Sequence, residues 1–231
     1  MSSATADSLV ALGHRVVAAG LVVTSGGNLA ARLPDTDHIV ITPRGWALDD
    51  LDSTVLSRVA LDGHQISGAY APTTELALHL AAYRARSDAV VSLHLHPPIA
   101  TLLHALGRPI WRITTDHAYY LRRLAVVPFI QPGSDQLAQA VATELASADI
   151  ILLRHHGCLI VADSFDVGFS RAANLEAAAT ASYRAHLLGG VVTECPPEFM
   201  AEVEAQEAAG VVYGKSADSG LAGDKCERNG T

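Results

Sequence analysis

The segment from Asp88 to His96 most constrains the fold, because it alternates in the manner of a β-strand. Successive strand residues point to opposite faces of a sheet. The odd positions from 89 to 95 are all apolar, whereas the even-numbered face ends in His94 and His96. Pro97 and Pro98 follow directly and end the strand. The segment therefore predicts a strand that carries two imidazoles on one face at its end.

Two imidazoles on one strand face are a ligand pair for a borderline metal such as zinc. A third imidazole is available at His155 or His156, in a predicted turn. Adjacent residues at a strand end point to opposite sides, so only one of the two is expected to reach the metal. Glu75 begins a predicted helix, where the helix dipole favours an ionised carboxylate. Hydrogen-bonded core histidines are the alternative, and the combination of four groups favours the metal site.

Length and composition favour one cytoplasmic domain that binds neither membrane nor nucleic acid. The 231 residues are 49% hydrophobic and carry a net charge of −8. That charge disfavours nucleic acid and anionic membranes as partners. We see neither a secretory signal nor an apolar span of about 20 residues, and three scattered cysteines are typical of a reducing compartment. Residues 1–214 are expected to form the domain and residues 215–231 a flexible tail.

Strands and helices alternate along the chain, but several strands are joined by tight turns. The expected helices are 5–19, 73–86 (capped by Thr73 or Thr74), 98–106, 134–147 and a long one from Ser164 to Gly189. The expected strands are 21–24, 29–33, 38–42, 88–96, 123–129, 149–155 and 158–162. Tight turns favour antiparallel neighbours, so we predict a layered α/β domain with a mainly antiparallel or mixed sheet rather than a Rossmann fold.

Two segments are candidates for anion binding. One is the turn Ser25-Gly26-Gly27-Asn28, and the other is the pair Thr73-Thr74 before the predicted helix. They offer backbone N–H groups, hydroxyls and an amide, which are groups that bind phosphate or carboxylate oxygens. A small anionic substrate is therefore the expected partner.

Together these segments resemble the class II aldolase and adducin family, which includes L-fuculose-1-phosphate aldolase and L-ribulose-5-phosphate 4-epimerase. The resemblance extends from about Leu9 to Leu188, and the order and spacing of the matching stretches are jointly specific. These stretches are 25–32 (Ser-Gly-Gly-Asn-Leu-Ala-Ala-Arg), 41–45 (Ile-Thr-Pro-Arg-Gly), 72–75 (Pro-Thr-Thr-Glu), 94–97 (His-Leu-His-Pro) and 156–157 (His-Gly).

The resemblance implies a three-layer α/β fold with a central, mainly antiparallel sheet flanked by helices. It also implies a homotetramer with active sites at subunit interfaces. The family's zinc ligands match His94, His96 and His156, and its catalytic acid/base matches Glu75. Its substrate phosphate site, together with neighbouring positions that we add as substrate-binding candidates, corresponds to Ser25, Gly27, Asn28, Arg44, Gly45, Thr73 and Thr74.

Some positions depart from the family pattern. Arg44 stands where sugar-phosphate members usually have Ser or Thr, so it is either an exposed turn residue or an added cation for a carboxylate or phosphate. Residues 114–120 loosely resemble an epimerase segment, from which we take His117 and Tyr120 as candidate catalytic residues. The alternative for both is packing at a subunit contact. Tyr213 matches a tail tyrosine of aldolases by position alone.

The predicted function is a divalent-metal-dependent lyase that stabilises an enediolate, most simply in aldol cleavage of a small ketose phosphate. Zn²⁺ is the expected ion, although imidazoles also suit Mn²⁺, Co²⁺ or Fe²⁺. The alternative is a metal-dependent decarboxylase of a hydroxylated or aromatic carboxylic acid, which Arg44 favours. An adducin-type scaffold would lack the ligands. A cupin-type oxygenase would have a Glu soon after the histidine pair, and none follows here.

Overall fold

The computed structural model describes residues 3–189 and 192–209. The chain divides into two compact units, Met1–Glu194 and Cys195–Thr231. In the second unit, the described residues form one helix, α7 (Pro197–Ala208). The predicted domain boundary at residue 214, the predicted tail and Tyr213 lie outside the described residues.

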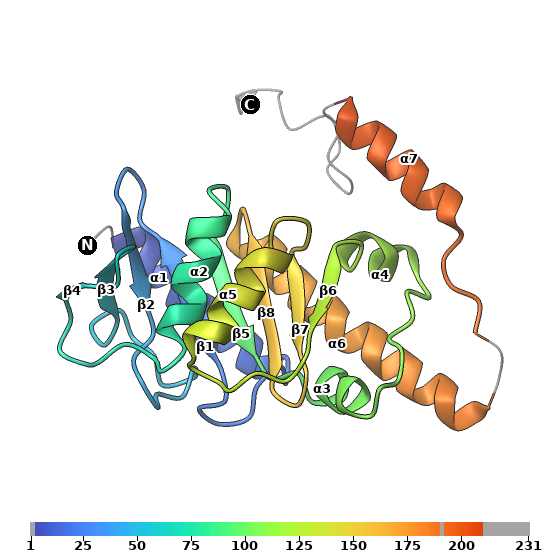
Figure 1. The fold of residues 1–231 in the computed structure, drawn as a ribbon, viewed down its shortest axis with the longest axis horizontal. Coiled ribbons are helices and arrows are strands. Elements are labelled where there is room, and N and C mark those ends of the chain that lie inside the picture. Colours follow the sequence, from blue (N-terminus) through green and yellow to red (C-terminus); the bar gives the residue numbers. More distant parts are fainter. Residues whose placement is uncertain (1–2, 190–191, 210–231) are drawn as a thin grey trace, which may run out of the picture. The chain divides into compact units, whose positions relative to one another are not determined.

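An eight-stranded sheet forms the centre of the first unit, with the order β4-β3-β2-β1-β5-β8-β7-β6 (Figure 1). Every neighbouring pair is antiparallel except β6 and β7, which are parallel. The strands are β1 (Asn28–Arg32), β2 (His38–Ile41), β3 (Ser57–Ala60), β4 (Gln65–Ser67), β5 (Val91–Leu95), β6 (Leu124–Val127), β7 (Ile150–Leu153) and β8 (Gly157–Ala162).

Helices cover both faces of the sheet, which gives three layers (Figure 1). One apolar cluster joins a sheet face to α1 (Ser3–Ala18), α3 (Pro98–Ala105) and α6 (Phe165–Leu188). A second cluster joins the other face to α2 (Leu76–Ala85) and α5 (Asp135–Glu144). The short helix α4 (Thr115–Tyr120) precedes β6. The predicted three-layer α/β fold with a mainly antiparallel sheet is thereby confirmed.

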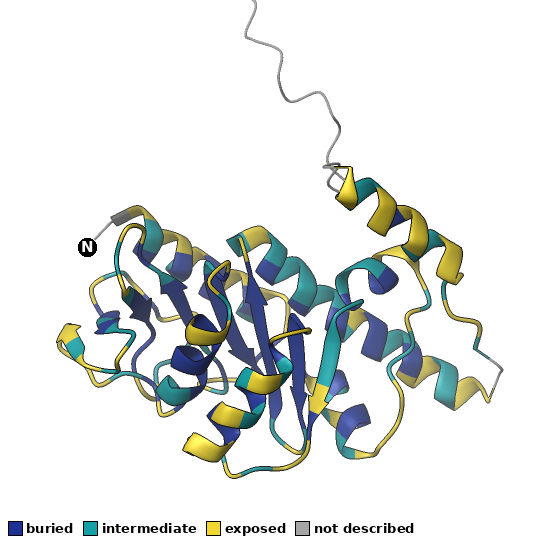
Figure 2. Ribbon diagram, turned by 45° about the horizontal axis from the view of Figure 1, so that its top comes forward, coloured by how far each residue is buried: buried dark blue, intermediate teal, exposed yellow. Residues whose placement is uncertain are grey.

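Strand β8 shows why both helical layers are needed. Cys158 and Ile160 belong to the cluster with α1 and α6, whereas Leu159 and Val161 belong to the cluster with α2 and α5. All six residues of β8 are buried, and the central strands are dark blue in Figure 2. A strand that is apolar on both faces gains from burial only when each face is covered.

Several elements differ from the sequence-based expectations. The predicted strand 21–24 is wrong, because Leu21 continues the end of α1, where its N–H donates to the Val16 carbonyl at 3.0 Å. Thr24 then has a left-handed φ of 53°, which turns the chain out of an extended path. The sequence analysis missed the short strands β3 and β4 and the helices α4 and α7. No described helix combines the length and apolar character needed to span a membrane.

Candidate active site

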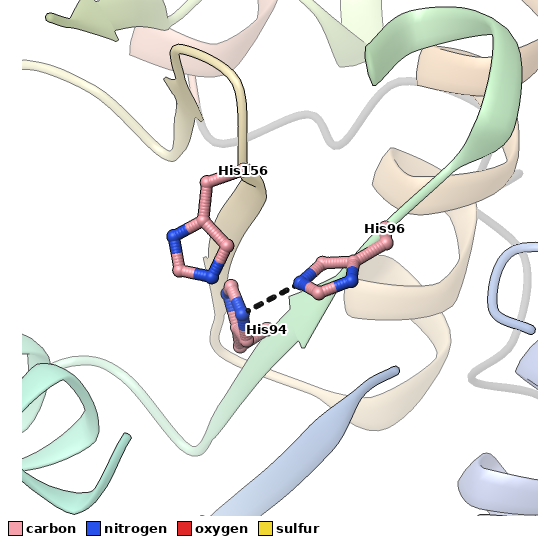
Figure 3. A group of neighbouring side chains, drawn as sticks. All are labelled: His94, His96 and His156. Carbon is pink, nitrogen blue, oxygen red and sulfur yellow. Dashed lines mark hydrogen bonds between the residues drawn. The ribbon is translucent and has the colours of Figure 1, made fainter. Parts of the chain in front are cut away.

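Three histidines converge at one end of the sheet. His94 lies in β5, His96 follows that strand, and His156 lies in the turn between β7 and β8. One ring nitrogen from each lies within 4.8 Å of the other two. Figure 3 shows the three rings turned toward one another. These three residues are hereafter the histidine cluster. His94 is buried, and the other two are half-buried.

Strand pairing explains why residues so far apart in the chain meet. β5 and β8 are antiparallel, with Leu95 opposite Cys158, so the end of one adjoins the start of the other. Gly157 makes the approach possible, because a Cβ there would collide with the His96 ring and the Leu95 carbonyl. The neighbouring His155 is exposed and has a φ of 56°. The turn therefore brings His156, and not His155, into the cluster.

The cluster is built from neutral imidazoles. Burial lowers the pKa of His94 well below its ordinary value, lowers that of His96 to about 4, and lowers that of His156. His94 Nδ1 lies 3.0 Å from the Cys158 carbonyl oxygen. Since a carbonyl only accepts, Nδ1 carries the proton and the Nε2 lone pair faces the other histidines. Neutral imidazoles of this kind are the form that ligates metals.

The donor set fits a divalent transition-metal ion. The Nε2 atoms of His94 and His96 are 3.0 Å apart, and His156 Nδ1 is buried with no hydrogen-bond partner in the described structure. Lone pairs held this close repel one another unless a proton or a cation lies between them. Three imidazoles with an open fourth position are typical of catalytic zinc. The fold thus forms a candidate metal site from these side chains.

Glu75 provides a buried carboxylate at the start of α2. It is 6% exposed, and its Oε2 atom has no hydrogen-bond partner among the described residues. Burial raises the pKa of this carboxyl, while a hydrogen bond from the Gly133 backbone N–H acts in the opposite direction. The expected N-cap at Thr73 or Thr74 is wrong, because Glu75 itself holds the cap position. The Thr73 hydroxyl accepts from the Glu75 N–H at 3.3 Å instead.

The predicted anion-binding segments come to the same end of the sheet as the cluster. Asn28 begins β1 directly opposite His94 in β5. Thr42 directly follows β2 and connects the two segments. Its hydroxyl accepts from the N–H of Leu29, the residue after Asn28, and its carbonyl accepts from the N–H of Thr73, each at 3.1 Å. A Cβ at Gly27 would lie 3.2 Å from the His94 carbonyl oxygen. Ser25 and Thr74, at the outer parts of these segments, are exposed.

Arg44 and Gly45 lie in the loop that follows β2. The backbone N–H of Arg44 donates to the Ala71 carbonyl at 3.0 Å, which ties this loop to the segment before Thr73. The Arg44 side chain is exposed, and Gly45 has a φ of 71° that favours glycine. The loop therefore presents a cation near the anion-binding segments.

His117 and Tyr120 lie in α4, at the other end of the sheet. β6 begins just after α4 and runs parallel to β7, with Leu124 opposite Ile150 and Val127 opposite Leu153. The turn that holds His156 follows Leu153, so the start of β6 is remote from it. One chain does not bring these two residues to the histidine cluster. Their predicted catalytic role would require a second copy of the chain.

Two further buried or half-buried residues, His79 and Glu176, support this site. The buried His79 ring contacts Asn28 Oδ1 at 2.7 Å and Ser92 Oγ at 2.6 Å. The two carboxylate oxygens of Glu176 in α6 accept the backbone N–H groups of Ile99 and Ala100, each at 2.9 Å. His79 lies one helical turn after Glu75, and that spacing was a usable signal.

A family model described as the class II aldolase and adducin N-terminal domain matches residues 7–183. The chain belongs to the class II aldolase and adducin family. The predicted membership is thereby confirmed. The residues that the family model matches include all three histidines of the cluster and Glu75.

Two curated relatives within the class II aldolase family differ in their named activities. The L-fuculose phosphate aldolase of Methanocaldococcus jannaschii is 35% identical over 136 residues, which cover 59% of this chain and 72% of the relative. A 3-oxo-tetronate 4-phosphate decarboxylase of Escherichia coli is 32% identical over 162 residues, which cover 68% of this chain and 76% of the relative.

Solved structures show the same class II aldolase fold. YgbL from Klebsiella pneumoniae has a TM-score of 0.78 at 27% identity, covering 86% of this chain and 97% of that one. An L-fuculose 1-phosphate aldolase has a TM-score of 0.81 at 24% identity, covering 90% of this chain and 98% of that one. At 24% identity, the similarity to this aldolase structure shows a shared fold alone.

Proposed function

We propose that this chain is a divalent-metal-dependent lyase that performs aldol cleavage of a small ketose phosphate. The observation that carries the proposal is the histidine cluster together with Glu75, whose buried Oε2 has no hydrogen-bond partner among the residues that the structure describes. Family membership and the aldolase relative support the lyase class. We further propose that the ion is Zn²⁺ and that the protein is a cytoplasmic homotetramer with active sites at subunit interfaces.

His94, His96 and His156 would hold the ion, because they are neutral and converge. When bound, a divalent cation supplies Lewis-acid stabilisation of negative charge on substrate oxygens. The Cys158 carbonyl fixes the His94 tautomer, so that Nε2 is oriented before the ion arrives. These ligands therefore need little rearrangement to form the site.

Glu75 would move the proton at the reacting carbon. Its raised pKa, caused by burial, brings the carboxyl closer to neutral pH, where a group can both accept and donate a proton efficiently. The Gly133 N–H hydrogen bond holds the carboxylate in place. Oε2 is the atom left to exchange the proton with the substrate.

The anion-binding segments would hold and orient the substrate phosphate. Ser25, Gly27, Asn28, Thr73 and Thr74 offer hydroxyl, amide and backbone N–H donors at the end of the sheet where the cluster lies. Gly45 would allow close approach of the loop backbone, and Arg44 would add a charge-assisted contact. Fixing the phosphate places the reacting carbons relative to Glu75, which lowers the entropic part of the barrier.

Decarboxylation is the second candidate, favoured by the exposed Arg44 and by the decarboxylase relative. Both reactions leave negative charge on a carbon next to a carbonyl, so the same site serves either. A guanidinium binds a planar carboxylate through two parallel hydrogen bonds. Arg44 would then hold a substrate carboxylate as well as, or in place of, a phosphate.

Product analysis tests the two candidates. The purified protein is assayed for metal content and for turnover of L-fuculose 1-phosphate, ribulose phosphates, a 3-oxo acid phosphate and hydroxylated aromatic carboxylates. Release of an aldehyde supports the aldolase, and carbon dioxide without aldehyde supports the decarboxylase. Neither product from any substrate, with metal present, would contradict both.

The metal ligands have a matched control in the same turn. His156→Ala is expected to lose bound metal and turnover, whereas His155→Ala is expected to keep both, because His155 is exposed and outside the cluster. Metal content is measured by elemental analysis after desalting. Full occupancy in His156→Ala would remove this residue from the ligand set.

A further inference from the structure

His79 is fully buried and is hydrogen-bonded on both ring nitrogens. Its Nε2 lies 2.7 Å from Asn28 Oδ1, and its Nδ1 lies 2.6 Å from Ser92 Oγ. The three residues come from α2, β1 and β5. This chain of contacts ends at Asn28, which begins β1 directly opposite His94.

The chain of hydrogen bonds has a direction. Burial lowers the pKa of His79 to about 3, so the ring is neutral at physiological pH and carries one proton. Asn28 Oδ1 is a carbonyl oxygen that only accepts, so the proton of His79 resides on Nε2. Nδ1 is then a bare acceptor and receives the Ser92 hydroxyl proton. Hydrogen-bond donation therefore runs from Ser92 through His79 to Asn28.

This direction decides which end of the Asn28 amide meets a ligand. Oδ1 is held on the interior side by a ring that is 0% exposed. Asn28 is itself half-buried, so part of the residue reaches solvent at the cluster end of the sheet. With the oxygen engaged, the group left for a ligand is the NH₂, which only donates. An NH₂ suits an anionic oxygen, whereas the reversed amide would present a carbonyl that repels one.

We propose that His79, held by Ser92, is a positioning residue that presents the amide N–H groups of Asn28 to the anionic group of the substrate. The proposal deepens the proposed function and rests on Asn28 binding that anion. His79 does not touch the substrate. It acts by removing the rotational freedom of the amide, so that the donor is in place before the ligand binds.

The direction of donation is tested without any substrate. In zinc-loaded protein labelled with ¹⁵N-histidine, the His79 ring signals are assigned by their loss in His79→Gln. We expect the Nε2–H tautomer in the wild type and a mixture of tautomers in Ser92→Ala. A pure Nδ1–H tautomer in the wild type would overturn the proposal, because Asn28 would then have to donate to the ring.

The effect on anion binding is tested with inorganic phosphate by calorimetry on the same zinc-loaded protein. We expect Ser92→Ala to bind phosphate about tenfold more weakly, with unchanged metal content. Ser92→Thr keeps the hydroxyl and should restore binding. Asn28→Asp still accepts from His79 but presents a carboxylate, so its phosphate binding should fall about a hundredfold or more.

A control variant separates this effect from general damage to the sheet. Ser67→Ala removes an exposed hydroxyl from the edge strand β4 and should bind phosphate like the wild type. In turnover assays, Ser92→Ala should raise KM with little change in kcat, which a purely structural role would not produce. Phosphate binding by Ser92→Ala equal to that of the wild type would overturn the proposal. Failure of the wild type to bind phosphate would overturn the phosphate site itself, and the tautomer result would still stand.

Discussion

Gly157 shows how one residue without a side chain allows the histidine cluster to form. A Cβ at this position would lie well inside van der Waals contact distance of the His96 ring and of the Leu95 carbonyl oxygen. Neither neighbour is free to retreat, because Leu95 is paired with Cys158 in the sheet and His96 belongs to the cluster. The presence of Gly directly after His156 thus has a steric reason.

We therefore expect Gly157→Ala to displace His96 and to weaken metal binding at least tenfold. The overpacked site should also cost about 1–3 kcal/mol of unfolding free energy. Urea denaturation and metal titration measure the two effects. Gly20→Ala is a control for metal affinity alone, because no described atom lies within 4 Å of the Gly20 Cβ position, whereas its φ of 70° makes an alanine there strained. Equal metal affinity in Gly157→Ala and the wild type would contradict the steric argument.

In the proposed reaction, proton transfer depends on Glu75. Glu75→Gln keeps the shape and the acceptor for the Gly133 N–H, but it cannot exchange a proton at the former Oε2. We expect kcat to fall about 10²–10⁴-fold while metal content is retained. Steady-state kinetics and elemental analysis check this. Turnover near that of the wild type would exclude Glu75 as the acid/base.

At the scale of elements, α3 is held by a carboxylate from another helix. Pro97 occupies its N-cap position and offers no side-chain hydrogen bond. Glu176 of α6 takes over this role by accepting the Ile99 and Ala100 N–H groups. A carboxylate at a helix N-terminus is also favoured by the helix dipole. Because α3 starts two residues after His96, this contact fixes the path of the chain away from the cluster.

Removing that carboxylate should loosen α3. Glu176→Ala is expected to cost about 1–3 kcal/mol of unfolding free energy, since two partly buried N–H groups lose their acceptor. Glu176→Gln should cost less, because one oxygen can still accept. The exposed Glu204 of α7 provides a control, and Glu204→Gln should leave stability unchanged. Urea unfolding decides the matter, and wild-type stability in Glu176→Ala would disprove the capping role.

At the scale of the whole molecule, buried neutral histidines make stability depend on pH. Burial lowers the pKa of His79 to about 3 and that of His96 to about 4, against about 6.5 in an unfolded chain. Between these values the unfolded state binds protons that the native state does not. Stability therefore rises with pH across this window and is lost as the pH falls below about 6.5.

The metal-free protein should show this dependence directly. We expect its unfolding free energy to fall between pH 6.5 and pH 4.5 by up to about 1.4 kcal/mol per pH unit for each of the two histidines. Thermal or urea unfolding of chelator-treated protein over this range provides the measurement. A flat profile would show that these rings are not held neutral by burial.

The sequence by itself determined the local features of this protein. Alternation in 88–96 was sufficient to predict a strand that leads to His94 and His96, and the ordered stretches from residue 25 to residue 157 were sufficient to indicate the family. Such features depend on the period of a strand and on short segments, both of which are readable without knowing the rest of the chain.

Only the tertiary structure decided which distant residues meet. The contact between His79 and Asn28 joins residues 51 apart, and the cap of α3 by Glu176 joins residues 77 apart. Helix α4 lies at the opposite end of the strands from His156, and this position follows from the parallel register of β6 and β7. Strand order and register are set by packing of the whole apolar core, so no local period in the sequence encodes them.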